Sequence, residues 1–289
     1  MISKKGEVRK AGESFQADNR SLDHQVIYNL MEKEFQETFI EELIPGIVHN
    51  FANPLNGIMG RARLLQRRLM EITQSGVRDG SSYEDNKNKL IHDVDSIVRE
   101  SDRLSSILQS VAGKFCAVSD KTIQRINLSE LIELEMKFLD FYLEFKHSIK
   151  KVVQLEQELP EVKGTPADYS LALSALIRHS MSAMKESDSK EFYISTQFEN
   201  GHVCMKIRNQ GPPIKEDQKR LLLEESQTDI SSLGMERNEG LTCAFLLLKK
   251  WGARFEIQSE SGFNVISVLI PPGRQRVSSI APPLPERSL

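Results

Sequence analysis

The chain has 289 residues and a formal net charge of −3, from 38 basic and 41 acidic residues that are interspersed along it. No field of one sign could attract nucleic acid or an anionic membrane, so we expect neither as a partner. The 39% of apolar residues can form a core, and the three cysteines lack the paired spacing of a zinc site or a disulfide framework. The longest apolar run, 241–248, is far shorter than the ~20 residues of a membrane span. We therefore expect a soluble cytoplasmic protein without a membrane span.

The two ends of the chain differ in composition from its middle. Residues 1–32 are polar with little periodicity and are expected to form a flexible lead-in, and the Pro- and Ser-rich segment 273–289 is expected to form a disordered tail. No sensor module is recognisable, so we expect the input to come from an upstream sensor partner that the sequence does not name.

Residues 33–122 carry the pattern of two long helices. Apolar residues step by three and four from about Phe35 to Ile72, and after a polar break they step four-three from Leu90 to Phe115. Two narrow stripes cannot enclose a core alone, so we expect an antiparallel helical hairpin that pairs with a second copy as a dimeric four-helix bundle. The first stripe is expected to bury Ile44, Ile47, Phe51, Leu55, Ile58 and Leu65.

Residues 126–272 mix helix and strand and predict an α+β fold for the chain as a whole. The expected elements are a helix from Leu128 to about Phe145, a strand near Ile149–Leu155, a helix from Pro166 to Met184, a β-hairpin around Asn200-Gly201, a helix from Leu241 to Lys250 and a strand pair split by Ser261-Gly262.

His49 has an unusual position in the first helix. At about 100° per residue, it points almost directly away from the predicted core stripe, with Asn53 and Asn56 close to it on the outer face. A buried core histidine is therefore disfavoured, and an ordinary surface histidine is the remaining alternative. Pro54 costs on the order of 3 kcal/mol in a helix interior and suggests a kink beside a site.

The stretch "HNFANPLNGI", with "RLL" following it, resembles the H-box of the dimerisation and phosphotransfer domain of sensor histidine kinases. The resemblance implies that His49 accepts a phosphoryl group and exchanges it with an aspartate of a response-regulator receiver domain. The family usually has Glu or Asp where this chain has Asn50, and an amide cannot serve as a base, so autophosphorylation should be weakened. Asn53 matches the residue that positions water to hydrolyse the phosphorylated partner.

Residues 126–272 also resemble the family's ATP-binding domain of the GHKL type, an α/β sandwich, which implies ATP and Mg²⁺ as cofactors if the site is functional. His179 stands where the family has a magnesium-binding asparagine, although Mg²⁺ prefers oxygen ligands. Asn209 replaces the adenine-reading aspartate while Gly211 is kept, and Gly240 survives from a later phosphate-binding glycine motif. The lid, 221–239, lacks the family's paired phenylalanines.

Three functions are compatible with these residues. The first is a protein-histidine kinase of a two-component system that phosphorylates His49 with ATP. The second is a pseudokinase-type dimeric phosphotransferase or phosphatase, as in a phosphorelay, that no longer binds ATP and needs no cofactor. The third is a dimeric adaptor without chemistry.

Overall fold

The computed structural model describes residues 24–75, 80–185, 187, 189–216, 219–220 and 239–273. Its chain begins with a helical segment at residues 24–38, which continues through the π-helix η1 (Phe39–Leu43) into α2 (Ile44–Ser75). The remaining elements are α3 (Gly80–Ser119), β1 (Gln124–Ile126), α4 (Leu128–Leu139), α5 (Leu143–Ser148), β2 (Lys150–Gln154), β3 (Val162–Gly164), α6 (Pro166–Met184), β4 (Glu191–Glu199), β5 (His202–Gln210), α8 (Glu239–Lys249), β6 (Arg254–Glu260) and β7 (Phe263–Ile270).

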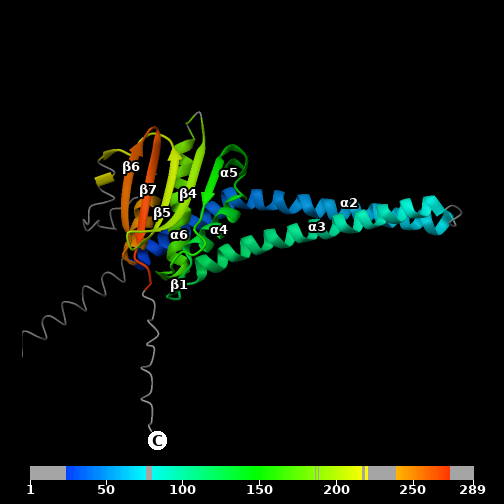
Figure 1. The fold of residues 1–289 in the computed structure, drawn as a ribbon, viewed down its shortest axis with the longest axis horizontal. Coiled ribbons are helices and arrows are strands. Elements are labelled where there is room, and N and C mark those ends of the chain that lie inside the picture. Colours follow the sequence, from blue (N-terminus) through cyan, green and yellow to red (C-terminus); the bar gives the residue numbers. More distant parts are fainter. Residues whose placement is uncertain are drawn as a thin grey trace, which may run out of the picture.

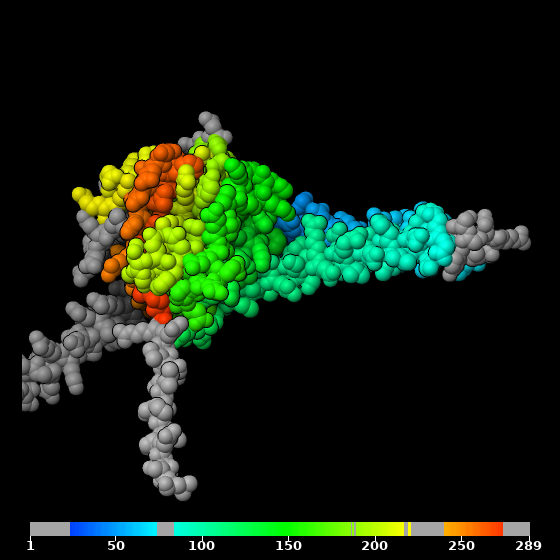
Figure 2. Space-filling model, viewed as in Figure 1, coloured from blue at the N-terminus to red at the C-terminus, as the bar shows by residue number. Residues whose placement is uncertain are grey.

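The molecule has the α+β fold and the helical hairpin that the sequence predicts. Helices α2 and α3 run antiparallel and project as a long arm from a mixed helix and sheet layer (Figure 1). The space-filling view shows the same narrow arm, formed by α2 and α3, on a broad body formed by the other described elements (Figure 2). None of the described helices is long and apolar enough to cross a membrane.

Five strands form the main sheet in the order β2-β4-β5-β7-β6, with β2 parallel to β4 and the other pairs antiparallel. Both predicted hairpin turns are confirmed. Asn200 and Gly201 have φ angles of 51° and 77°, and Ser261 and Gly262 have 51° and 81°. Two consecutive positive φ angles are typical of the two-residue turns that match the twist of paired strands. Strands β1 and β3 form a separate antiparallel pair.

Side-chain caps fix the starts of the two central helices. The Asn127 side chain accepts hydrogen bonds from the backbone N–H groups of Ser129 and Glu130 at the start of α4. The Thr165 side chain accepts one from Asp168 at the start of α6, where Pro166 occupies the first turn. These residues satisfy backbone donors that have no partner within the helix, so the helices begin where the sequence places them.

The single helix predicted from Leu128 to about Phe145 is wrong, because the structure has two. Helix α4 ends at Leu139, and α5 begins at Leu143 after a short turn. Phe141 and Tyr142 in that turn are 4% and 6% exposed. Burial of these two rings in the core contributes to stabilising the break.

The flexible lead-in predicted for 1–32 is corrected over its last part, because residues 24–32 are helical and packed against the body. Ile27, Tyr28 and Met31 are buried, and the Tyr28 hydroxyl donates a hydrogen bond of 2.9 Å to the carbonyl of Val118. The spacing of these apolar residues forms a helical stripe within an otherwise polar stretch. Residues 1–23 and 274–289 lie outside the described residues.

The predicted core stripe of α2 is only partly correct. Its partly buried members are Ile47, Phe51, Ile58 and Leu65. Ile44 and Leu55 are exposed by 38% and 47%, while Pro54 is buried. The helix continues through Pro54, and its irregular hydrogen bonding lies earlier, in η1. The face of α2 that packs within one chain is therefore rotated about the helix axis from the predicted face.

The predicted seam of α3 divides into two halves that alternate along the helix. One half is partly buried within the chain and consists of Leu90, Ile97, Leu104 and Val111. The apolar members of the other half are exposed, namely Val94, Leu108 and Phe115. A single hairpin therefore covers every second seam position and leaves the others uncovered.

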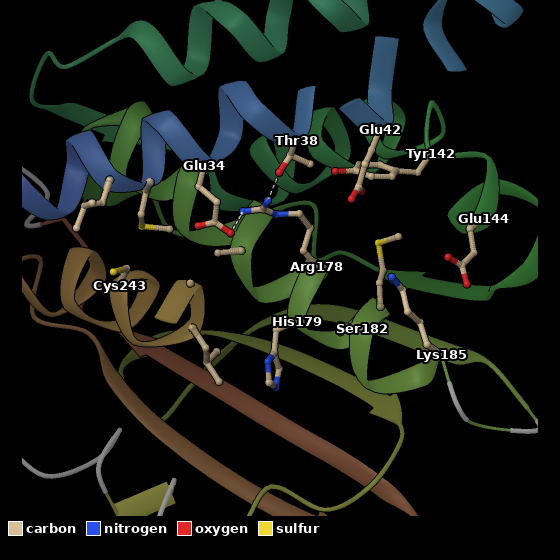
Figure 3. A pocket seen from close by; sticks show the side chains of 16 residues that line it. Glu34, Thr38, Glu42, Tyr142, Glu144, Arg178, His179, Ser182, Lys185 and Cys243 are labelled. Atoms are coloured by element: carbon tan, nitrogen blue, oxygen red, sulfur yellow. Dashed lines mark hydrogen bonds and ion pairs between the residues drawn. The ribbon is translucent and has the colours of Figure 1, made fainter. Parts of the chain in front are cut away.

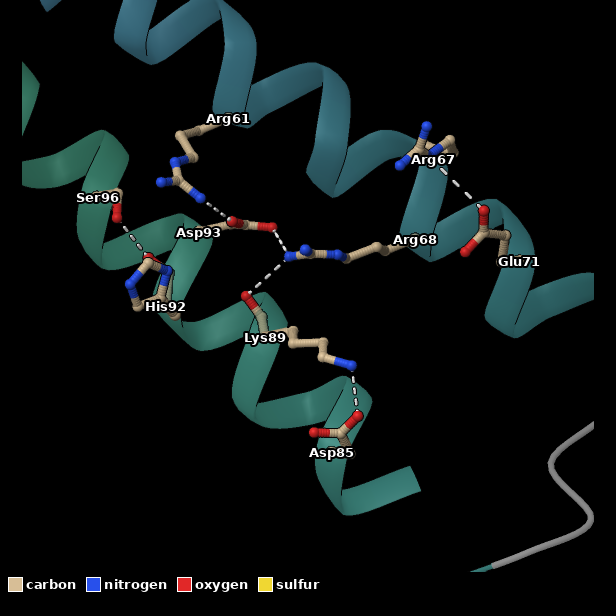
Figure 4. Close-up of polar contacts among 9 residues, drawn as sticks. All are labelled: Arg61, Arg67, Arg68, Glu71, Asp85, Lys89, His92, Asp93 and Ser96. Carbon is tan, nitrogen blue, oxygen red and sulfur yellow. Dashed lines mark hydrogen bonds and ion pairs between the residues drawn. The ribbon is translucent and has the colours of Figure 1, made fainter. Parts of the chain in front are cut away.

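A buried carboxylate links the two helices of the arm (Figure 4). Asp93 of α3 has no exposed side-chain area and forms ion pairs with Arg61, at 3.1 Å, and with Arg68. Arg68 also donates a hydrogen bond to the carbonyl of Lys89. Because both arginines come from α2, these bonds set the register of the two helices.

A second buried ion pair joins the arm to the body. The ammonium of Lys114 on α3 lies 2.5 Å from the carboxylate of Glu135 on α4, and both side chains are at most 1% exposed. It also donates to the hydroxyls of Ser170 and Ser174 on α6, at 2.8 and 2.6 Å. The pair therefore bonds the end of the hairpin to two helices of the body.

Candidate functional site

His49 lies on the exposed side of α2, as the helical phase predicts. Asn53, one turn further along, is exposed as well. Within the described part of the chain, the His49 ring has no hydrogen bond or ion pair. The ring is therefore exposed and makes no polar contact within the described residues.

The polar atoms of the Asn50 side chain bond away from the His49 ring. Asn50 is 5% exposed. The amide nitrogen donates to the carbonyl of Gly46 at 2.8 Å, and the amide oxygen accepts from the ammonium of Lys146 on α5 at 2.9 Å. Asn50 thus connects α2 to the body, on a different side of the helix from His49.

Gly46 makes this contact possible. A Cβ atom at this position would lie 1.8 Å from the carbonyl oxygen of Phe141, in the turn between α4 and α5. Any larger residue would therefore separate α2 from the turn, and Lys146 would no longer reach Asn50. Lys146 carries no signal of its own in the sequence, but a glycine inside the helix, one turn before the histidine, indicates close packing at this point.

A cavity of about 480 Å³ lies between the segment 24–38, η1, α5, α6 and α8 (Figure 3). Its charged and polar lining includes Glu34, Thr38, Glu42, Tyr142, Glu144, Arg178, His179, Ser182 and Lys185. Of the predicted nucleotide residues, His179 and Gly240 line this cavity, whereas Asn209 and Gly211 do not. The predicted lid, 221–239, lies outside the described residues except for Glu239.

Arg178 is held by the N-terminal segment on one wall of the cavity. Its guanidinium donates to the hydroxyl of Thr38 at 2.6 Å and to the carboxylate of Glu34 at 2.9 Å (Figure 3). The buried Nε has no hydrogen-bond partner among the described residues. Both terminal nitrogens of this arginine are therefore engaged within the chain.

His179 is a poor ligand for magnesium in this setting. Burial lowers the pKa of its imidazole, so the ring is neutral at pH 7 and offers only nitrogen. Mg²⁺ requires oxygen ligands in octahedral geometry. In the described part of the chain, no group of three or more His, Cys, Asp or Glu side chains could hold a metal ion.

Asn209 and Gly211 lie at the end of β5, against α6. Asn209 is 1% exposed, and its amide donates to the carbonyl of the next residue, Gln210. Gly211 has a φ of 155°, and a Cβ there would lie 2.8 Å from the carbonyl oxygen of Ala183. Gly211 is therefore required for the close approach of the loop to α6, whatever the cavity binds.

The sequence matches no protein-family model and no curated protein. Its structure is similar to those of histidine kinases. The catalytic domain of the histidine kinase ThkA aligns over 52% of this chain and 97% of its own, with 20% identity and a TM-score of 0.44.

Two other similar structures extend over more of the chain. The histidine kinase AdeS of Acinetobacter baumannii aligns over 74% of this chain and 96% of its own, with 14% identity and a TM-score of 0.40. The complex of ThkA with the response regulator TrrA aligns over 85% of this chain and 66% of the other, with 18% identity and a TM-score of 0.41.

Proposed function

We propose that the chain is a two-component signalling protein that carries a phosphoryl group on His49 and exchanges it with an aspartate of a response-regulator receiver domain. The observation that carries this proposal is the free, exposed imidazole of His49 beside exposed Asn53, within the H-box-like stretch. Residues 33–122 would then act as the dimerisation and phosphotransfer part.

Exchange with a receiver suits the groups that are present. A neutral ring nitrogen of His49 attacks the phosphorus of the aspartyl phosphate, the N–P bond forms, the O–P bond breaks, and the aspartate leaves as a carboxylate. The polar atoms of Asn50 bond to Gly46 and Lys146 and make no bond with the attacking ring, so they leave its nitrogens free for this step.

We further propose that the chain acts as a homodimer. The exposed half of the α3 seam is apolar, and the exposed apolar residues of α2 include Ile44, Leu55 and Met59. Large apolar stripes of this kind mark interaction surfaces. A second hairpin of the same sequence would cover both stripes in a four-helix bundle.

The second candidate function is phosphorylation of His49 by ATP. The position of the cavity favours it, because Glu42 lines the cavity and precedes His49 by two helical turns, about 10 Å along the axis. The residues of the cavity do not fit a magnesium–nucleotide complex, however, since His179 offers nitrogen and the carboxylate of Glu34 holds Arg178. This function is therefore the weaker candidate.

The test begins with receiver domains from the host, labelled on aspartate by a small phosphodonor such as acetyl phosphate. Acid-labile label should appear on the chain and be absent in His49→Gln. With Asn53→Ala, the receiver should keep its own label longer than with the wild type, because Asn53 is expected to position the water that hydrolyses the phosphorylated receiver. A receiver label that never reaches the chain, and decays equally fast with and without it, would contradict the proposal. Acid-labile label on His49 from ATP and Mg²⁺ would instead establish the second candidate.

A further inference from the structure

Glu34 lies at the end of the cavity where an anion would be expected to bind. Its two carboxylate oxygens are 3.4 and 3.5 Å from the position that a Cβ of Gly240 would take. Gly240 is the second described residue of α8, so the carboxylate lies beside the described start of that helix. The first backbone N–H groups of a helix have no partner within it and attract negative charge.

The same carboxylate also neutralises the cation that faces this end of the cavity. Arg178 donates to Glu34 at 2.9 Å, and its other terminal nitrogen donates to Thr38. The arginine that would recruit a phosphate is therefore already paired with a carboxylate of the protein itself, and the same carboxylate lies beside Gly240.

The helical segment that carries Glu34 is anchored on either side of this residue. Met31 and Phe35 flank it and are 2% and 5% exposed. The ring of Phe35 packs against those of Phe115 and Phe138, with centroids 6.0 and 6.2 Å away. A competing ligand would have to displace the side chain alone, without help from movement of the helix.

The charge of the lining adds to this exclusion. Three carboxylates, those of Glu34, Glu42 and Glu144, face the cavity with two cations, Arg178 and Lys185. His179 adds no charge, because desolvation of its partly buried ring lowers the pKa of the imidazole and keeps it neutral at pH 7. A ligand with several phosphates would therefore meet a surplus of negative charge in the cavity.

We propose that Glu34 determines what the cavity accepts: its carboxylate occupies the anion-binding end and excludes polyphosphates such as ADP and ATP. This proposal can fail without affecting the proposed exchange between His49 and a receiver, because that exchange needs no nucleotide.

The test measures ADP binding to the full chain by calorimetry, with and without Mg²⁺, for the wild type and for Glu34→Gln. Glutamine keeps the length of the side chain and an oxygen that accepts from Arg178, but it removes the negative charge. We expect ADP to bind at least about tenfold more tightly to Glu34→Gln, with a gain that shrinks as salt is added. The affinity for adenosine, which has no phosphate, should not change between the two proteins.

Glu42→Gln is the matched control, because it removes one charge from the same cavity but breaks no contact with Arg178. It should change ADP affinity less than about threefold. Glu34→Ala is the second variant, and a far-ultraviolet spectrum with a melting curve shows whether each variant is folded. Equal ADP binding by the wild type and both Glu34 variants, or an equal gain in Glu42→Gln, would overturn the proposal.

Discussion

At the residue scale, the most constrained side chain is Lys114. It has no exposed area, and burial lowers the pKa of its ammonium, against the attraction of Glu135. Phe35 and Phe138 place their rings 5.1 and 5.8 Å from the ammonium. A buried charge of this kind is tolerated only when its partners are all present.

Lys114→Met should therefore destabilise the fold by about 3–5 kcal/mol, because Glu135 would be left buried without its cation. The measurement is urea unfolding followed by circular dichroism. The double variant Lys114→Met/Glu135→Met should recover most of the loss, since no buried charge remains. If Lys114→Met were as stable as the wild type, the ion pair between Lys114 and Glu135 would not be essential for packing the arm against the body.

At the element scale, α2 provides two glycines in opposite surroundings. Gly46 faces the carbonyl of Phe141 at a distance that excludes any side chain, whereas a Cβ at Gly60 would have no atom within 4 Å. The same substitution at the two positions therefore separates the effect of packing from that of helix propensity.

Gly60→Ala should raise the free energy of unfolding by about 0.5–1 kcal/mol, as alanine does in an open helix position. Gly46→Ala should lower it by about 1–3 kcal/mol, because α2 must move away from the turn before α5. Thermal and urea unfolding of the two variants measure both values. The account of this contact fails if Gly46→Ala is as stable as Gly60→Ala.

The elements also show how far sequence reasoning extends. The turns at Asn200-Gly201 and Ser261-Gly262 and the start of α6 could be predicted, because each depends on residues that are adjacent in the chain. The exposure of His49 followed from helical phase. The contacts of Asn50 with Lys146 and of Glu34 with Arg178 could not be predicted, because they join residues 96 and 144 positions apart.

At the scale of the whole molecule, the arm has an uncovered apolar side. Val94 and Leu108 of α3 are 45% and 53% exposed, although they belong to the same predicted seam as residues that are partly buried. The hairpin of a second copy has the same spacing of apolar residues and would cover this side of α3.

The wild-type chain should therefore have the mass of a dimer in light scattering at micromolar concentration. Val94→Glu/Leu108→Glu should reduce it to a monomer, because two carboxylates would be buried in the bundle. Phe198→Glu, which changes an equally exposed apolar residue on β4, should remain dimeric. A monomeric wild type would refute the four-helix bundle.

Phosphorus-31 NMR tests whether His49 is the phosphoryl carrier, without a nucleotide or a partner. The chain has six histidines, and His92 is a matched control because it is also exposed on the hairpin. After incubation with phosphoramidate, a small phosphoryl donor, the wild type and His92→Gln should show one phosphohistidine signal that His49→Gln lacks. The same signal in His49→Gln, or no signal in any of the three proteins, would contradict the account.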